Sequence, residues 1–244
     1  PEELSPREQS RRLFVDLNVN YDAETAYLDA ELERLHSYLA GRNMIENTLW
    51  IFTSDHGEGM GSHNYPSHPK FIYEELTGIP MTLHHPAWPN KGLVVTEPVH
   101  HVDVFPTLAE LIGVAEPTQV YPFQGRSLVP LIDRDKVQFP HRYLFSERPR
   151  KVFSQWEDGE VFAIRDAGVK YIHHTEGTDE LFDLTNDPFE LSNLIGTAPD
   201  LEKKLLESVL TVYDGLVEQS VQKTEKEELS DEEVEELKAL GYIE

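Results

Sequence analysis

Apolar residues recur at helical spacing near the start of the chain. Between residues 22 and 41, leucines stand at positions 28, 32, 35 and 39. Intervals of four, three and four residues place these side chains on one face of a helix. Gly41 follows as a stop signal. The pattern therefore predicts an amphipathic helix that ends near residue 41.

Two apolar runs without alternation come next. They cover residues 48–53 and 79–83, and such runs are typical of strands covered on both faces, as in a parallel sheet. A Gly-, Pro- and His-rich stretch and a short helical piece at 71–77 separate them, and a further helix is predicted over 102–112. The sequence of strand, crossover and strand predicts an α/β core.

From about residue 142 the pattern changes to short β-rich segments. The segments at 143–145, 161–164 and 169–172 are separated by turns that contain glycine. Such spacing predicts a small antiparallel sheet. A helical pattern over 201–216 follows and is expected to pack on this sheet.

The C-terminal end of the chain predicts a linker and an acidic helix. Residues 219–228 are polar, and Ser230 with Glu233 forms a capping box at the start of a helix with an apolar stripe. The patterns divide the chain into the C-terminal part of an α/β core domain at 1–141, a small antiparallel subdomain with its packing helix at 142–220, and a linker with an acidic C-terminal helix at 221–244.

Acidic residues dominate the charge of the chain. Its 45 acidic residues against 21 basic ones give a formal net charge of −24, which repels phosphate backbones and makes nucleic acid an unexpected partner. Adaptation to high salt and an ordinary acidic protein explain this charge equally well. No apolar run reaches the roughly 18 residues of a membrane helix, so no membrane span is expected. No signal-peptide pattern is present in these residues, which weakly favours the cytoplasm but leaves the location open, since the upstream region lies outside these residues. The absence of cysteine excludes a thiolate metal site or a cysteine nucleophile within these residues.

Asp55 and His56 directly follow the first predicted strand. Ligands of open α/β sheets gather beyond the carboxyl ends of the strands. A carboxylate and an imidazole at such a position can converge on one cation, and the glycines that follow let the backbone approach closely. The alternative is that Asp55 caps a turn and His56 lies on the surface, and spacing alone does not separate the two interpretations.

Two further candidates, His68 and Lys70, lie a few residues beyond His63. Lys70 supplies a fixed positive charge and His68 exchanges a proton near neutral pH, which suits an oxyanion substrate and an alkoxide leaving group. Either residue alone would be interpreted as a solvated surface group. The nearby metal candidates favour the functional interpretation.

Three pairs of adjacent histidines stand at 84–85, 100–101 and 173–174. Adjacent side chains on a strand point to opposite faces, so we expect none of these pairs to bind a metal. The pair at 100–101 is the strongest of the three, because it lies at a predicted junction between a strand and a helix.

Several short motifs occur in a fixed order along the chain. Two of them are Ser54–Glu58 with the downstream His63, and Tyr73–Pro80. The others lie at 21–39, 102–108, 125–131, 181–190 with 193–194, and 240–242. Together they resemble the C-terminal portion of the sulfatase family, within the alkaline phosphatase superfamily. The resemblance covers nearly the whole chain and implies the C-terminal part of an alkaline-phosphatase-like parallel sheet sandwiched by helices, with a small antiparallel-sheet subdomain and C-terminal helices.

The resemblance implies a metal-dependent, arylsulfatase-like sulfuric ester hydrolase. In this family a divalent cation holds a small sulfate ester, and formylglycine attacks its sulfur. By position, Asp55 and His56 would be metal ligands, with His56 where many members have asparagine. Calcium is the expected cation, and magnesium, manganese and zinc are alternatives.

The resemblance also implies roles for three other side chains. Lys70 and His68 are the candidate catalytic residues, and His63 and Lys70 are the candidate substrate-binding residues. The usual family lysine stands four residues before the tyrosine of the Tyr-Glu-Glu motif. Here Lys70 stands three residues and His68 five residues before Tyr73, so either side chain could contact the leaving group.

The nucleophile motif of the family, Cys or Ser followed by x-Pro-x-Arg, does not occur in these residues. The chain is therefore expected to be the C-terminal part of a larger enzyme, whose upstream half supplies formylglycine and further metal ligands. Without that partner, the chain should show little hydrolysis and should expose an apolar sheet edge and face. Two other functions stay open: phosphoryl or phosphonate ester hydrolysis or transfer by the same architecture, and a non-catalytic sulfatase-like module.

Overall fold

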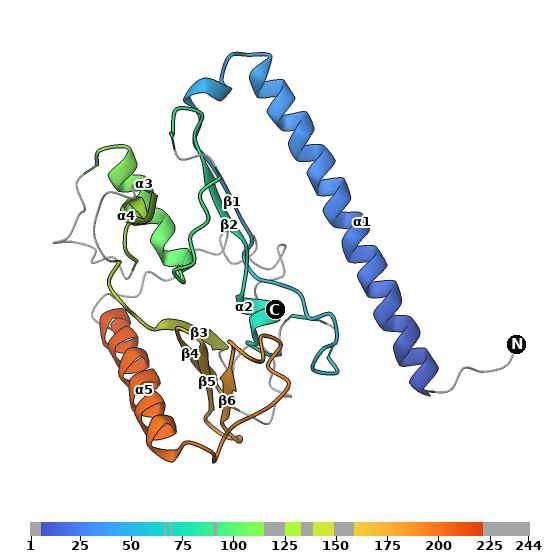
Figure 1. Cartoon of the computed structure of the whole chain (residues 1–244), viewed down its shortest axis with the longest axis vertical. Helices are drawn as coiled ribbons and strands as arrows, with labels where there is room; N and C mark the ends of the chain where they lie inside the picture. Colours follow the sequence, from blue (N-terminus) through green and yellow to red (C-terminus); the bar gives the residue numbers. More distant parts are fainter. Residues whose placement is uncertain are drawn as a thin grey trace, which may run out of the picture.

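The structure is a computed structural model that describes residues 6–65, 67–68, 70–89, 92–114, 125–132, 139–148 and 159–221. The helices are α1 (Pro6–Ala40), α2 (Glu74–Thr77), α3 (Val104–Leu111), α4 (Val129–Ile132) and α5 (Pro199–Val221), with 3₁₀ turns η1 (Ile45–Asn47) and η2 (His101–Asp103). The strands are β1 (Trp50–Thr53), β2 (Met81–His84), β3 (Leu144–Arg148), β4 (Val161–Asp166), β5 (Val169–His174) and β6 (Glu180–Asp183). They form two sheets, β1-β2 and β3-β4-β5-β6 (Figure 1). Helices and sheets together match the predicted α/β class.

Helix α1 is longer than predicted and stands apart from the sheets (Figure 1). It ends at Ala40, just before the predicted stop at Gly41, but it begins at Pro6, a residue suited to the first turn of a helix. Several apolar side chains in its second half are exposed: Tyr27 is 69% exposed and Leu28 is 49% exposed. Much of this apolar surface is therefore uncovered by the described residues.

Strands β1 and β2 pair antiparallel, with Trp50 opposite His84 and Thr53 opposite Met81. The prediction of parallel pairing is wrong for these two strands, because an apolar run reports burial and carries no information on direction. Among the described residues β1 is not covered on both faces as its apolar run predicted, since Phe52 is 44% exposed. This exposure agrees with the expectation of an uncovered apolar sheet surface.

The four-stranded sheet is antiparallel throughout, as predicted. The three predicted segments lie in β3, β4 and β5, and β6 is an additional strand. Side chains alternate between two faces. Phe162 and Ile164 pack with Leu205 of α5 on one face, while Val161 and Ala163 pack with residues just before α2 on the other. The sheet thus separates α5 from the segment that carries the Tyr-Glu-Glu motif.

The predicted helix at 102–112 is present as η2 followed by α3. Asp103 is fully buried and connects the segments at 102–108 and 125–131. Its carboxylate accepts hydrogen bonds of 2.8 Å from the backbone N–H groups of His100 and Arg126, and both of its oxygens pair with the Arg142 guanidinium. This buried ion pair ties the start of α3 to the segment that leads into β3.

The remaining helix predictions are met in part. The predicted 71–77 helix is shortened to α2, and the predicted 201–216 helix is extended at both ends as α5. The predicted C-terminal helix that starts at Ser230 lies outside the described residues, and the three-part division of the chain stays a prediction. No helix among the described residues combines the length and the apolar character needed to cross a membrane.

Candidate functional site

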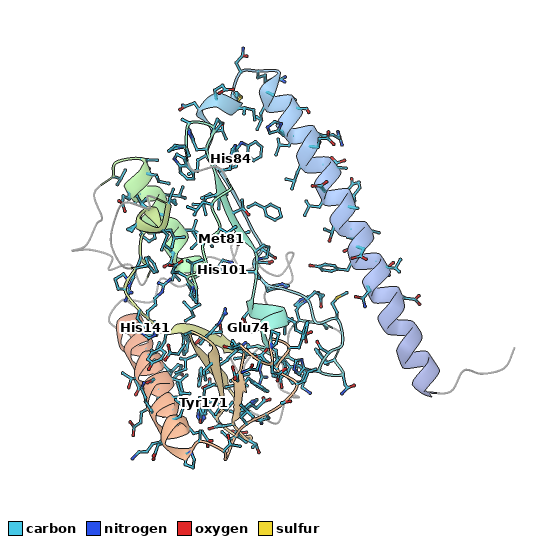
Figure 2. The ribbon with its side chains drawn as sticks, in the orientation of Figure 1. Glu74, Met81, His84, His101, His141 and Tyr171 are labelled. Carbon is cyan, nitrogen blue, oxygen red and sulfur yellow. The ribbon has the colours of Figure 1, made fainter. Side chains whose placement is uncertain are left out.

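A cleft of about 830 Å³ lies between the β1–β2 pair and the four-stranded sheet. Figure 2 shows Glu74 and His101 in this region, between the two sheets. Residues from the loop after β1, from α2, from the segment before η2 and from β3–β5 line the cleft. Among them are Asp55, His56, His68, His101, Arg165 and Lys170. The structure therefore brings three predicted site residues to one cavity.

The side chains of Asp55 and His56 converge. Asp55 Oδ2 lies 3.7 Å from His56 Nε2, and His56 Nδ1 lies 2.7 Å from the carbonyl oxygen of Gly57. Because a carbonyl oxygen only accepts hydrogen bonds, Nδ1 is the protonated nitrogen, and in a neutral ring Nε2 then offers its lone pair. The pKa of Asp55 is lowered, chiefly because the His56 backbone N–H donates to Oδ1 at 3.0 Å. A carboxylate and an imidazole lone pair therefore face each other in the cleft.

His68 is held against His56. The two rings stack with their centroids 4.2 Å apart and their planes at 28°. His68 Nδ1 lies 3.0 Å from Glu58 Oε2, which fixes the orientation of the ring. The structure thus brings Asp55, His56 and His68 together as one cluster. Their separation along the sequence did not predict the contact between His56 and His68.

Lys70 and His63 lie outside this cluster. Neither residue lines the cleft among the described residues, and the Lys70 ammonium sits 4.8 Å from the ring centroid of Phe71, which does line it. The His63 ring stacks on Tyr73 at 3.6 Å, and its nitrogens lie 3.2 Å from Glu75 Oε1 and 3.0 Å from the Glu190 carbonyl oxygen. Both ring nitrogens therefore face protein acceptors, and substrate binding by Lys70 or His63 stays a prediction.

The histidines at 100–101 have a place in the site that the sequence analysis did not give them. His101 Nε2 lies 2.6 Å from the carbonyl oxygen of Ser54, and His100 Nε2 lies 2.8 Å from that of Phe145. Both residues line the cleft. Their position just before a predicted helix was the available signal. Because they point in different directions, the pair connects the loop after β1 to strand β3.

The loop that carries Asp55 and His56 docks on α2 at Gly57. The Gly57 N–H donates to the Leu76 carbonyl at 2.8 Å, and a Cβ at this position would overlap the carbonyl oxygen of Glu75. Only glycine allows this close approach. Gly57 of the motif thus serves backbone packing beside the site.

Replacing Gly57 by alanine is expected to lower the free energy of unfolding by about 1–3 kcal/mol, because the added methyl group overpacks the contact with α2. Urea denaturation followed by circular dichroism measures this change. The matched control is Gly215→Ala in α5, where nothing lies within 4 Å of the added Cβ and where alanine should stabilise the helix slightly. Equal stability of the two variants would contradict the packing described for Gly57.

Comparison with known proteins identifies the class of fold. A solved phosphonate monoester hydrolase of Agrobacterium radiobacter superposes with a TM-score of 0.67 and 26% identity, over 78% of this chain and 40% of that one. The chain therefore has the alkaline-phosphatase-like fold of sulfatases and related hydrolases.

Similar proteins and a family profile identify which family within this fold the chain belongs to. A Delta 4,5-hexuronate-2-O-sulfatase of Bacteroides thetaiotaomicron is 32% identical over 174 residues, which are 68% of this chain and 34% of that protein. A choline-sulfatase of Rhizobium meliloti is 32% identical over 179 residues, 71% of this chain and 32% of the relative. The chain thus spans about a third of the length of these relatives. The profile of the N-sulphoglucosamine sulphohydrolase C-terminal family matches residues 61–230, and the chain belongs to this family.

Proposed function

We propose that the chain is the C-terminal part of an enzyme that hydrolyses sulfate esters. The observation that carries the proposal is the pair formed by Asp55 and His56, which face each other in the cleft of a sulfatase-family fold. The two relatives described above are named for sulfates of different alcohols, a hexuronate and choline. Their shared chemistry is the sulfate ester, so the sulfate ester is the substrate class proposed here.

We propose Asp55 and His56 as two ligands of a divalent cation, most simply Ca²⁺. Two donors on one cation lie roughly 3–4.5 Å apart, because each metal–ligand distance is about 2.0–2.4 Å. The 3.7 Å between Asp55 Oδ2 and His56 Nε2 fits this range. A metal-binding histidine usually donates its other ring N–H to a carboxylate or a carbonyl oxygen, and His56 Nδ1 has such a partner in the Gly57 carbonyl.

The described residues contain no group of three or more His, Cys, Asp or Glu side chains that could hold a metal ion. Divalent cations in proteins usually take four or more ligands. We therefore propose that further ligands, and the formylglycine nucleophile, come from a part of the intact protein outside this chain. When bound, the cation would supply positive charge to the nonbridging oxygens of the ester.

The residues of this chain then have separate tasks. Asp55 stays ionised because its pKa is lowered, and His56 keeps its proton on Nδ1. His68, oriented by Glu58 and stacked on His56, can donate a proton to the leaving oxygen. Lys70 would supply a fixed charge to the sulfate oxygens after a movement of its side chain toward the cleft.

The test uses the intact polypeptide that contains this chain. It is expected to hydrolyse p-nitrophenyl sulfate, to lose this activity in EDTA and to regain it with Ca²⁺ or Mg²⁺. The 244-residue chain alone should show little turnover. Turnover that survives complete removal of divalent cations would contradict the metal site, and robust turnover by the isolated chain would contradict the need for the rest of the protein.

A second candidate is phosphonate ester hydrolysis. The observation that favours it is the solved phosphonate monoester hydrolase with the same fold. The two functions are distinguished by assaying p-nitrophenyl phenylphosphonate beside the sulfate ester. A higher kcat/KM for the phosphonate would replace the sulfatase proposal with this one.

A further inference from the structure

We propose that Lys170 and Glu190 are positioning residues, whose buried ion network with Glu74 holds the loop that carries Asp55 and His56 in place. The network joins two motifs that the proposed chemistry leaves unused, the Tyr-Glu-Glu segment and the segment after β6. This inference rests on the proposed function, because positioning matters only if the loop binds a cation and an ester.

Lys170 is the centre of the network. It lies on β5 and is only 2% exposed, and lysine is almost never buried unless it is paired. Its ammonium lies 3.1 Å from Glu74 Oε1, 3.2 Å from Glu190 Oε1 and 3.2 Å from Thr77 Oγ1. Glu74 Oε1 and Thr77 Oγ1 accept hydrogen bonds from the ammonium, and Glu190 Oε1 forms an ion pair with it. The geometry therefore fixes both ends of α2, at Glu74 and Thr77, to the sheet.

Glu74 also pairs with a residue on a second strand. Its Oε2 lies 3.1 Å from the Arg165 guanidinium of β4, and Arg165 stands directly opposite Lys170 in the register of β4 and β5. In Figure 2, Glu74 lies at the border between α2 and the four-stranded sheet. Two cations on neighbouring strands thus hold the two oxygens of one carboxylate.

Glu190 holds α2 and His63 at the same time. Its carboxylate accepts a hydrogen bond from the Glu74 backbone N–H, and its carbonyl oxygen lies 3.0 Å from His63 Nε2. The residue is 2% exposed and has a φ of 54°, a left-handed conformation that costs a non-glycine residue free energy and persists only where its surroundings impose it. Burial raises the pKa of this carboxyl, against the opposing effect of Lys170.

The contacts continue from α2 to the loop. Glu75, next to Glu74, binds Ser62 and lies 3.2 Å from His63 Nδ1. The Leu76 carbonyl accepts from the Gly57 N–H, and the Gly57 carbonyl in turn orients the His56 ring. An unbroken series of contacts therefore runs from Lys170 to the two proposed metal ligands.

The test replaces Lys170 by methionine in the intact polypeptide and measures two properties. The first is hydrogen exchange of the Gly57 amide, which is expected to become at least about 10-fold faster as its bond to α2 opens more often. The second is Ca²⁺ affinity by isothermal titration calorimetry, which is expected to fall about 10–100-fold, the usual effect of losing support for metal ligands. The conservative variant Lys170→Arg should restore part of both.

The matched control is Leu205→Ala, which removes a buried side chain from the opposite face of the same sheet. It should lower stability without changing Gly57 exchange or Ca²⁺ affinity at a temperature where both variants are folded. Equal changes in both variants, or no change in Lys170→Met, would overturn the inference. If Lys170→Met does not fold, Glu190→Gln takes its place, with the same expected direction and the same overturning result.

The two proposals fail in different ways. An intact polypeptide that neither binds Ca²⁺ nor hydrolyses the ester would contradict the proposed function, while the exchange measurement would still show whether Lys170 and Glu190 hold the loop. Normal Ca²⁺ binding and hydrolysis with unaltered Gly57 exchange in Lys170→Met would contradict the positioning role alone.

Discussion

Replacement of Arg142 by methionine is expected to lower the free energy of unfolding by about 3–5 kcal/mol, because it leaves a buried charge without its partner. Asp103 is fully buried and receives both guanidinium nitrogens of Arg142. The two remaining backbone donors, from His100 and Arg126, do not neutralise the carboxylate. Urea denaturation followed by circular dichroism gives the magnitude.

The control for this variant is Arg34→Met. Arg34 pairs with Glu31 on the exposed surface of α1, where an ion pair adds little because solvent screens both charges. The midpoint of unfolding should therefore stay within experimental error. An Arg142→Met protein as stable as the control would show that Asp103 has another compensating partner.

Replacement of Asp55 by asparagine is expected to reduce kcat/KM of the intact polypeptide by about 1,000-fold or more, since a lost metal charge removes several kcal/mol of transition-state stabilisation. Asparagine keeps the size of the side chain and an oxygen donor, but it removes a negative charge that strengthens the binding of a divalent cation. Calcium affinity should fall together with the activity, and circular dichroism should show an unchanged fold.

Asp183→Asn is the matched control for Asp55→Asn. The pKa of Asp183 is also lowered, chiefly by the side chain of Asn186 and then by the Thr185 backbone N–H, but Asp183 does not line the cleft among the described residues. This variant should keep its kcat/KM and Ca²⁺ affinity. Asp55→Asn with near-normal kcat/KM would remove Asp55 from the metal site.

Local pattern was sufficient for much of the fold. The pattern of apolar residues located α3, α5 and three strands of the antiparallel sheet, because each of these elements contributes buried or partly buried apolar side chains to a core. Strand β6 was missed, since only Leu181 and Phe182 in it are buried and acidic residues flank them. The direction of β2 relative to β1 could not be predicted from the apolar pattern, because it depends on the path of the long connection between the two strands.

The candidate site was predictable where its residues are adjacent in sequence. Asp55 and His56 stand together at the end of a strand, a position that made convergence on a cation one of two open interpretations, and the resemblance to sulfatases favoured it. The contact between His56 and His68 depends on how the intervening loop folds back. The burial of Lys170 depends on partners at Glu74 and Glu190, far along the chain in both directions, so no local pattern could reveal it.

The histidine pair at 100–101 has a consequence for how this protein tolerates variation. Both imidazoles contact main-chain oxygens, those of Phe145 and Ser54, and every amino acid supplies such an oxygen. The link between the two walls of the cleft therefore does not depend on the side chains at 54 and 145, which have other contacts, with the His56 carbonyl and with Phe162. Only the two imidazole rings contribute side-chain groups to these two hydrogen bonds.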